Sequence, residues 1–349
     1  MINEFGQRLR SARKMAGMSL DGLVEATGAI VSKQAISKYE KGLINPSSDV
    51  LLALAKALGI KVDYFFRPNK VNISNVAFRK KSKLSRREED RIRYLAQDFL
   101  QKYIELEEIL NLPHSYDNPV SNREIHSDAD IEAAAKEIRQ KWNLGEAPIN
   151  QLTELLEDKG FKVLEVDTDP DFVGLSGFAD GLNVPVIAVA ADSDCVRKRF
   201  TLAHELAHLL LDFSHSDQNH EKLCHAFAGA LLLPEQAIRE EFGGERKKIT
   251  EWELKKLKGM YGISMQAIMA RALTLELITS QAYKMFCIFV SRAGWRKDEP
   301  GSYSGIEKAN RFKQLIIQAV AEQIISYSKG AEFLDMPLGE FEREVHVVS

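Results

Sequence analysis

Cysteine is scarce in this chain, and so are the patterns that mark secretion or membrane insertion. The 349 residues hold three cysteines, at 195, 224 and 287, too few and too widely spaced for a disulfide framework. No apolar run approaches the length of a membrane span, and the N-terminus lacks the positive start and apolar stretch of a secretory signal. These absences favour a cytoplasmic protein with no membrane partner.

The sequence also lacks the patterns of several common cofactor and hydrolase sites. It has no P-loop or dinucleotide-binding glycine pattern, no internal repeat at a fixed period and no low-complexity tract, and no Ser/His/Asp set suggests itself. Hydrophobic residues make up 45% and charged residues 28%, which is ordinary for a globular protein. The length allows two or three domains, each with its own core.

Charge is divided unevenly along the chain. Residues 1–93 hold 19 Lys and Arg against 9 Asp and Glu, whereas the remaining residues hold 28 against 41. A basic front followed by an acidic body is typical of a protein whose N-terminal part binds a polyanion. A solvated basic face would give the same charge distribution. Sequence motifs are therefore needed to distinguish a polyanion-binding domain from such a face.

Residues 4–66 have the pattern of five short helices. The segments 4–16 and 48–58 carry apolar stripes, Ser19 and Ser32 can cap a second and a third helix, and a short fifth covers 62–66. The stretches "FGQRLRSARKMAGMSLDGLVEATG", "SKQAISKYEKG" and "PSSDVLLALAKALGI" together resemble the Xre-type helix-turn-helix of phage-repressor-like DNA-binding domains. The resemblance implies double-stranded DNA as a partner, and the usual pair of half-sites implies a homodimer.

In this motif the recognition helix enters the major groove with its N-terminal residues nearest the bases. Gln34 suits bidentate reading of adenine, and Lys38 suits guanine or phosphate. Ile36 and Tyr39 on the same helix are expected in the core, and any one exposed position could be an idle surface charge. The expected DNA contacts are Lys33, Gln34, Ser37 and Lys38 on the recognition helix, with Arg10, Lys14 and Lys41 at phosphates.

The stretch His204-Glu205-Leu206-Ala207-His208 is the most informative one in the chain. Two histidines four residues apart on a helix lie on one face, so one divalent metal can accept both. Glu205 projects beside that face, where it can take a proton from a water at the metal. Apolar flanks place the motif on a buried helix, and a core helix with two satisfied histidines is the alternative.

A catalytic zinc usually has three protein ligands and one open position. Residues from Glu221 onward predict a second helix, ended by Pro234, and a connecting loop of about ten residues would let the two helices lie antiparallel. Glu221 is therefore predicted as the third ligand, with His225 one turn away as its polar partner. Three other donors, expected to be solvated or in the core, are His215, His220 and Cys224.

The stretches "FTLAHELAHLLL" and "EKLCHAFAGALLLP" are similar to the ImmA/IrrE family of zinc metallopeptidases. The resemblance implies His204, His208 and Glu221 as Zn2+ ligands and Glu205 as the general base. The chain departs from the family pattern at His225, where Asn or Asp is usual, and at position 223, where a second acidic residue often stands. If the family ligand corresponded to position 223, the choice of Glu221 would be wrong.

Around the motif, segments 161–166, 173–179 and 185–190 have the pattern of strands. They predict a small antiparallel sheet whose free edge could hold an extended substrate. Residues 113–122 are polar and contain proline, which predicts a hinge, and the basic residues 197–199 just before the motif are expected at the surface. Further helices are predicted at 85–110, 127–142, 151–159, 252–260, 264–277, 281–290 and 306–328, and a small helix-turn-helix near the end.

The sequence thus predicts a mainly α fold with a small antiparallel β-sheet (α+β). The implied function is a DNA-binding transcriptional regulator with a zinc-dependent endopeptidase domain that cleaves a repressor-type or antitoxin-like protein in a stress, phage or mobile-element response. The alternative is a DNA-binding repressor or antitoxin-like protein whose zinc domain senses a signal or partner without proteolysis. The predicted parts are a helix-turn-helix domain at 1–68, a basic linker and long helix at 69–126, a zincin-like metallopeptidase domain at 127–245 and a helical C-terminal region at 246–349.

Overall fold

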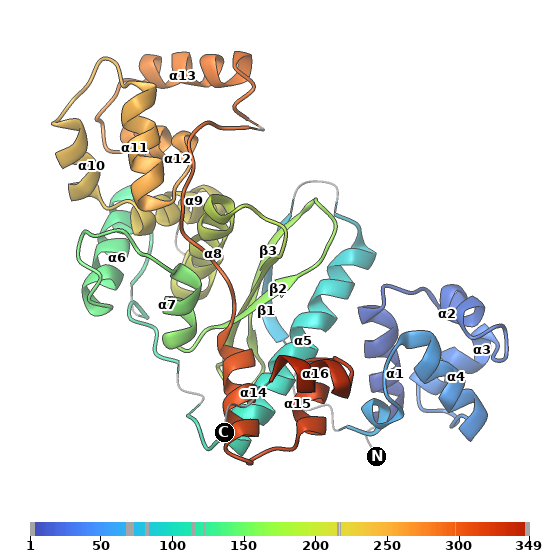
Figure 1. Ribbon diagram of the computed structural model, residues 1–349. Coiled ribbons are helices and arrows are strands. Elements are labelled where there is room, and N and C mark those ends of the chain that lie inside the picture. Colours follow the sequence, from blue (N-terminus) through green and yellow to red (C-terminus); the bar gives the residue numbers. More distant parts are fainter. Residues whose placement is uncertain are drawn as a thin grey trace.

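Three bodies of secondary structure follow one another in space (Figure 1). The N-terminal helices lie at one end, a sheet with helices packed on it lies in the middle, and a helical lobe lies at the other end. This computed structural model describes residues 4–67, 73–80, 84–113, 116–121, 123–214, 216, 218–296 and 298–345, and for 73–80 it describes the backbone.

The N-terminal domain contains the five helices that the sequence predicts. They are α1 (Glu4–Met15), α2 (Leu20–Ala26), α3 (Lys33–Glu40), α4 (Ser48–Leu58) and the 3-10 helix η1 (Val62–Phe66). The hydroxyl of Ser19 accepts a hydrogen bond from the amide of Gly22, and that of Ser32 from the amide of Ala35, so both predicted caps are confirmed. The fully buried core residues are Leu9, Leu23, Ile36, Leu54 and Phe65.

The central sheet is mixed, which corrects the predicted antiparallel arrangement. Strands β2 (Lys162–Val166), β3 (Phe172–Ala179) and β4 (Pro185–Ala190) lie where the sequence places them. β3 runs antiparallel to β4, but β2 pairs parallel with β4. A strand pattern shows which residues face a core but not which strands become neighbours, and here β4 rather than β3 lies beside β2.

A fourth strand, β1 (Ile73–Lys80), extends the sheet to the order β1-β3-β4-β2 among the described residues. It was not predicted, because this segment was assigned to a linker. β1 pairs antiparallel with β3, from Ile73 opposite Ala179 to Lys80 opposite Phe172. Among the described residues, the first element after the N-terminal domain is therefore a strand of the sheet.

The long helix α5 (Arg86–Ile109) lies at the centre of the molecule. Its residues Ile92 and Leu100 belong to apolar clusters with residues of the sheet. From its other side, Tyr103 and Leu106 contact the C-terminal helices α14 (Arg311–Ala321), α15 (Tyr327–Phe333) and α16 (Leu338–Glu344). The ring of Phe312 stacks on that of Tyr103 with centroids 5.0 Å apart. The apolar stripe of α5 thus packs on the body of the same chain.

The main hydrophobic core lies on the other side of the sheet. It joins α6 (Asp128–Lys141), α7 (Leu152–Asp158), α8 (Cys195–Leu210) and α9 (His220–Leu232). The same core continues into the outer lobe, made of α10 (Glu235–Phe242), α11 (Glu251–Tyr261), α12 (Met265–Thr274) and α13 (Ser280–Arg292). Because Leu254 and Ile268 belong to this core, the lobe and the motif helices are packed as one unit.

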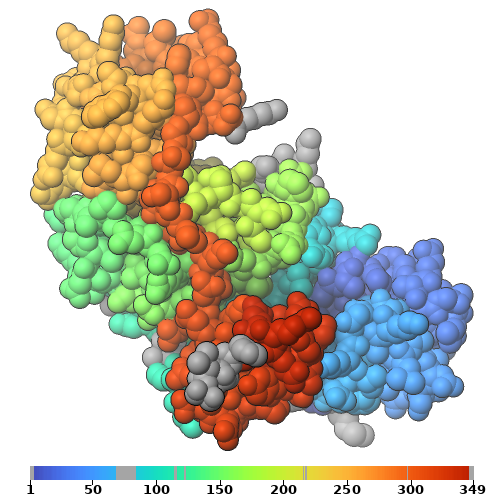
Figure 2. Space-filling model, in the orientation of Figure 1, coloured from blue at the N-terminus to red at the C-terminus, as the bar shows by residue number. Residues whose placement is uncertain are grey.

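An extended segment from the outer lobe crosses the body to reach α14, as the orange chain in Figure 2 shows. The predicted helix at 306–328 therefore begins only at Arg311. The reason lies at Glu307, whose carboxylate accepts hydrogen bonds from the amides of Leu152 and Thr153 at the start of α7. Because the Glu307 side chain caps α7, the backbone around Glu307 stays extended and does not join helix α14.

Within the described part of the chain, no helix is both long enough and apolar enough to cross a membrane.

Candidate metal centre and nucleic-acid interface

The helix α8 carries the His-Glu-x-x-His motif into the core. Asp194 caps it by accepting a hydrogen bond from the amide of Arg197 at 3.0 Å. Its apolar flank packs so closely that His204 and Glu205 have no exposed surface, whereas the side chain of His208 keeps 16%. The predicted buried motif helix is confirmed in its position.

The three predicted metal ligands converge on one point. The Nε2 atoms of His204 and His208 lie 3.2 Å apart. The carboxylate of Glu221, at the start of α9, places one oxygen 3.3 Å from the Nε2 of His204 and the other 3.3 Å from that of His208. In a tetrahedral zinc site with bonds of roughly 2.0–2.1 Å, ligand atoms stand roughly 3.3–3.4 Å apart. The donor set therefore fits Zn2+. The side chain of Glu221 is 52% exposed, so solvent can reach the three donor atoms from its side.

Cys224 offers a second possible donor set with the same two histidines, because donor atoms of His204, His208 and Cys224 lie within 4.8 Å of one another. Its sulfur, however, lies 3.7 Å from Nδ1 of His208, whereas the nitrogens that face each other and Glu221 are the Nε2 atoms. One imidazole does not present both nitrogens to a single ion. We therefore favour the set with Glu221 and place Cys224 behind the His208 ring.

The three other histidines near the motif, His215, His220 and His225, differ in their surroundings. The ring of His225 packs against that of His204 with centroids 4.6 Å apart, and its Nδ1 lies 2.6 Å from the backbone oxygen of Glu221. It thus touches two of the predicted ligands. His220 stacks on Phe213, and His215 lies outside the described residues. Position 223, the alternative ligand position, holds a leucine that is fully buried in the core.

Glu205 is held against strand β3. The hydroxyl of Ser176 donates a hydrogen bond to its carboxylate at 2.7 Å, in a fully buried setting. At position 174 a side chain would not fit, because a Cβ atom there would lie 2.7 Å from the Glu205 carboxylate. Neither position was predicted from the sequence, although small residues at alternate positions of a strand can indicate the close approach of another element.

The basic residues before the motif are buried, which corrects the expected surface position for two of them. Arg199 has no exposed surface and pairs with Glu307 at 2.5 Å, and Lys198 pairs with Glu165. Gly262 allows this, because a Cβ there would lie 2.5 Å from the Arg199 guanidinium. Arg199 therefore joins α8 to the extended segment that crosses the body. Because these ion-pair partners are far apart in the sequence, no local sequence pattern predicts that Lys198 and Arg199 are buried.

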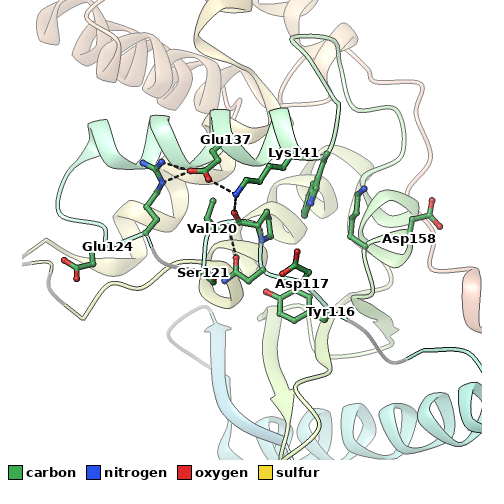
Figure 3. A pocket seen from close by; sticks show the side chains of 13 residues that line it. Tyr116, Asp117, Val120, Ser121, Glu124, Glu137, Lys141 and Asp158 are labelled. Carbon is green, nitrogen blue, oxygen red and sulfur yellow. Dashed lines mark hydrogen bonds and ion pairs between the residues drawn. The ribbon is translucent and has the colours of Figure 1, made fainter.

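A pocket of about 1090 Å³ opens elsewhere, between α6 and the segment that precedes it (Figure 3). Lys141 donates to the carbonyl of Pro119 at 2.6 Å and pairs with Glu137, and Asn118 donates to the carbonyl of Leu210 at 2.9 Å. In its described residues 116–121 the expected hinge is thus anchored on the body. The lining contains neither the histidine pair nor Glu221, so this pocket is separate from the candidate metal centre.

The helix α3 lies on the side of the N-terminal domain that faces away from the body (Figure 1). Gln34 and Lys38 are exposed on it, as are Arg10 and Lys41 elsewhere in the domain, and Ile36 and Tyr39 are buried as predicted. Two predicted contacts have partners within the chain. Lys33 pairs with Asp21 at 2.7 Å, and Lys14 pairs with Asp90 of α5.

Two neighbouring helices that bring a histidine pair and a carboxylate together beside a small mixed sheet define a metallopeptidase-like domain. The pair α2 and α3 defines a helix-turn-helix. Comparison with protein families agrees with both assignments. Residues 156–273 match the peptidase family described as the IrrE N-terminal-like domain, and residues 9–65 match the helix-turn-helix family. The N-terminal part of the chain is thus similar to helix-turn-helix domains, and its central part is similar to the IrrE N-terminal-like domain of the M78 peptidases.

Curated relatives share one short region with this chain. An uncharacterized HTH-type transcriptional regulator of Sinorhizobium fredii is 41% identical over 61 residues, which is 18% of this chain and 41% of that protein. A regulator of the same description from Mycobacterium tuberculosis is 39% identical over 61 residues, 42% of its length. An uncharacterized transcriptional regulator of Rhodospirillum rubrum is 41% identical over 55% of its length. The chain thus spans about half the length of these relatives. No solved structure matches it.

Proposed function

We propose that this chain is a transcriptional regulator that binds DNA through its N-terminal domain and cleaves a protein through a zinc-dependent endopeptidase domain. The observation that supports the second half is the triangle of donor atoms from His204, His208 and Glu221, with edges of 3.2–3.3 Å. The resemblance to the ImmA/IrrE family adds the substrate class, which is a repressor-type or antitoxin-like protein.

The three donors would hold Zn2+, which supplies a Lewis acid and lowers the pKa of water when bound. Glu205 would then act as the general base and accept a proton from the water that attacks the peptide carbonyl. The same carboxylate returns that proton to the leaving nitrogen, which completes hydrolysis. The hydrogen bond from Ser176 fixes the orientation of Glu205, and the burial of both groups excludes bulk water from the carboxylate.

On the DNA side, the proposal assigns base reading to Gln34 and Lys38 and phosphate contact to Arg10, Lys14 and Lys41. The assignment of Gln34 and Lys38 is supported by the position of α3, which faces outward from the body and leaves both side chains exposed. Binding as a homodimer to two half-sites belongs to the same proposal.

The deciding experiment compares wild type with Glu205→Gln. Each protein is purified, its zinc content is measured, and each is incubated with candidate repressors. We expect equal zinc and a loss of cleavage of about 100-fold or more in the variant, because the amide cannot accept the proton. Glu154→Gln on the exposed side of α7 is the matched control and should cleave like wild type.

Equal cleavage by wild type and Glu205→Gln would remove the peptidase proposal. A zinc domain that senses a signal without proteolysis would remain as the alternative. The buried Glu205 argues against it, since a structural site has no need of a base.

A further inference from the structure

Strand β1 covers the outer edge of β3. β4 occupies the opposite edge of β3, so β1 takes up the only other edge through which β3 can pair with an extended chain. β1 is also the segment that follows the DNA-binding domain, since η1 ends at Phe66 and β1 begins at Ile73.

The register places β1 beside the proposed general base. The two β3 positions that contact Glu205 are Gly174, through its missing side chain, and Ser176, through its hydroxyl. Their partners in β1 are Arg79 and Ala77. Cα atoms of β1 also lie within 8 Å of Cα atoms of α8, the helix that carries the motif.

Proteins commonly hold an extended peptide by adding it as a strand to a free sheet edge, where backbone hydrogen bonds give the affinity. A substrate held in this way must run next to the element that carries the base. The edge of β3 is that place, and a single edge accepts a single strand at a time.

We propose that β1 is an internal occupant of the substrate position, so that residues 73–80 close the peptidase site and an extended substrate binds by replacing them antiparallel to β3. The inference rests on the proposed peptidase function. It also connects the two halves of the protein, because a displacement of the DNA-binding domain would withdraw the strand that follows it.

The contacts that hold the DNA-binding domain to the body support this connection. Lys14 and Arg8 of α1 pair with Asp90 and Asp98 of α5, the second pair at 3.7 Å. Arg67, at the end of the DNA-binding domain, pairs with Glu332 of α15 at 2.7 Å. The Lys14–Asp90 and Arg67–Glu332 pairs are partly exposed, so a competing polyanion or higher salt would weaken them, whereas the Arg8–Asp98 pair is largely buried.

The test replaces residues 73–80 in the full chain by eight alternating glycines and serines, in a Glu205→Gln background. The probe is a fluorescent peptide of sequence ISNVAFRK, titrated by anisotropy. We expect it to bind the replaced protein roughly tenfold or more tightly than it binds the Glu205→Gln protein with its own strand, because the internal competitor is gone. Amides of β3 should also exchange hydrogen faster in the replaced protein, while those of α6, α8 and α9 stay protected.

Two matched peptides check the register. Successive backbone amides of a strand point to opposite sides, so the amides of positions 77 and 79 share one side and that of position 78 lies on the other. N-methylation at position 78 alone and at positions 77 and 79 must therefore have different effects. We expect one of the two to abolish binding and the other to preserve it.

Equal peptide binding with and without the internal strand, or equal effects of both methylation patterns, would overturn the proposal. So would cleavage of the wild-type, zinc-loaded chain within its own residues 73–80, since β1 would then be a substrate. Because the binding assay uses Glu205→Gln, an absence of peptidase activity would not by itself change its result.

Discussion

Among the predicted ligands, Glu221 differs in its setting from the two histidines. His204 is fully buried, whereas the carboxylate side chain of Glu221 is 52% exposed and begins a helix. A negative side chain at a helix N-terminus interacts favourably with the dipole of the helix. This makes Glu221 a suitable anionic ligand, and it also makes its role directly testable against that of Cys224.

We expect Glu221→Gln to lose zinc and Cys224→Ser to keep it. Glu221→Gln removes the anionic donor from the triangle, which should weaken zinc binding by about 100-fold or more. Cys224→Ser alters a group behind the His208 ring, where a substitution has a smaller effect on zinc affinity. Zinc content after dialysis against a graded chelator measures both. The reverse order of the two variants would assign the third position to Cys224.

Gln34 is the residue on which sequence reading by the DNA-binding domain is predicted to depend. We expect Gln34→Ala to relax the preference for adenine at one position of the half-site, at a cost of about 1–3 kcal/mol on the preferred sequence, because a bidentate contact is lost. Binding to a randomised DNA library followed by sequencing measures this. Lys41→Ala is the control and should weaken binding on all sequences alike. An unchanged base preference for Gln34→Ala would contradict the assignment.

At the scale of elements, helix α7 contains a buried carboxyl group, that of Glu157, whose pKa depends on how the helix is packed. Burial raises the pKa of Glu157 from 4.5 to about 7, although the amide and guanidinium of Arg311 act in the opposite direction. The folded protein thus holds this proton more tightly than the unfolded chain does. The resulting stabilisation is complete below about pH 4.5 and is lost as the pH rises through 7.

We therefore expect Glu157→Gln to be more stable than wild type at pH 8, by at most about 3 kcal/mol, and nearly equal to it at pH 4.5. Urea unfolding at the two pH values gives the difference. Glu154→Gln, an exposed change on the same helix, is the matched control and is unfolded at the same two pH values. A Glu157→Gln variant that tracks wild type at both values would show that the carboxyl group titrates normally.

The elements that the sequence predicts correctly are those with local signals. Ser32 and Ser127 cap helices because each side chain accepts a hydrogen bond from an amide three residues on. The spacing of His204 and His208 likewise determines their common face. What the sequence misses depends on distant partners, such as the pairing of β1 with β3 or the ion pair between Arg199 and Glu307. The helix α14 begins late for the same reason.

At the scale of the whole molecule, α5 joins the functional parts. Its apolar face supports the sheet, and its N-terminal half contacts α1 of the DNA-binding domain. Asp90 of α5 pairs with Lys14, which is also a predicted phosphate contact. If Lys14 contacts phosphate as predicted, a phosphate and Asp90 would compete for one ammonium group, and DNA binding would loosen the domain from the body.

This competition predicts a specific double-mutant cycle. We expect Asp90→Asn to raise DNA affinity on all sequences alike and to steepen the dependence of log affinity on log salt by about 0.9, because one more lysine becomes available to neutralise phosphate. Lys14→Ala should weaken binding on all sequences and flatten the same slope. Filter binding at four salt concentrations measures both. In a Lys14→Ala background the slope change caused by Asp90→Asn should disappear, since the two side chains act through one pair. If Asp90→Asn steepens the slope equally with and without Lys14, the ion pair does not compete with DNA, and the acidic side chain acts only through the general field of the body.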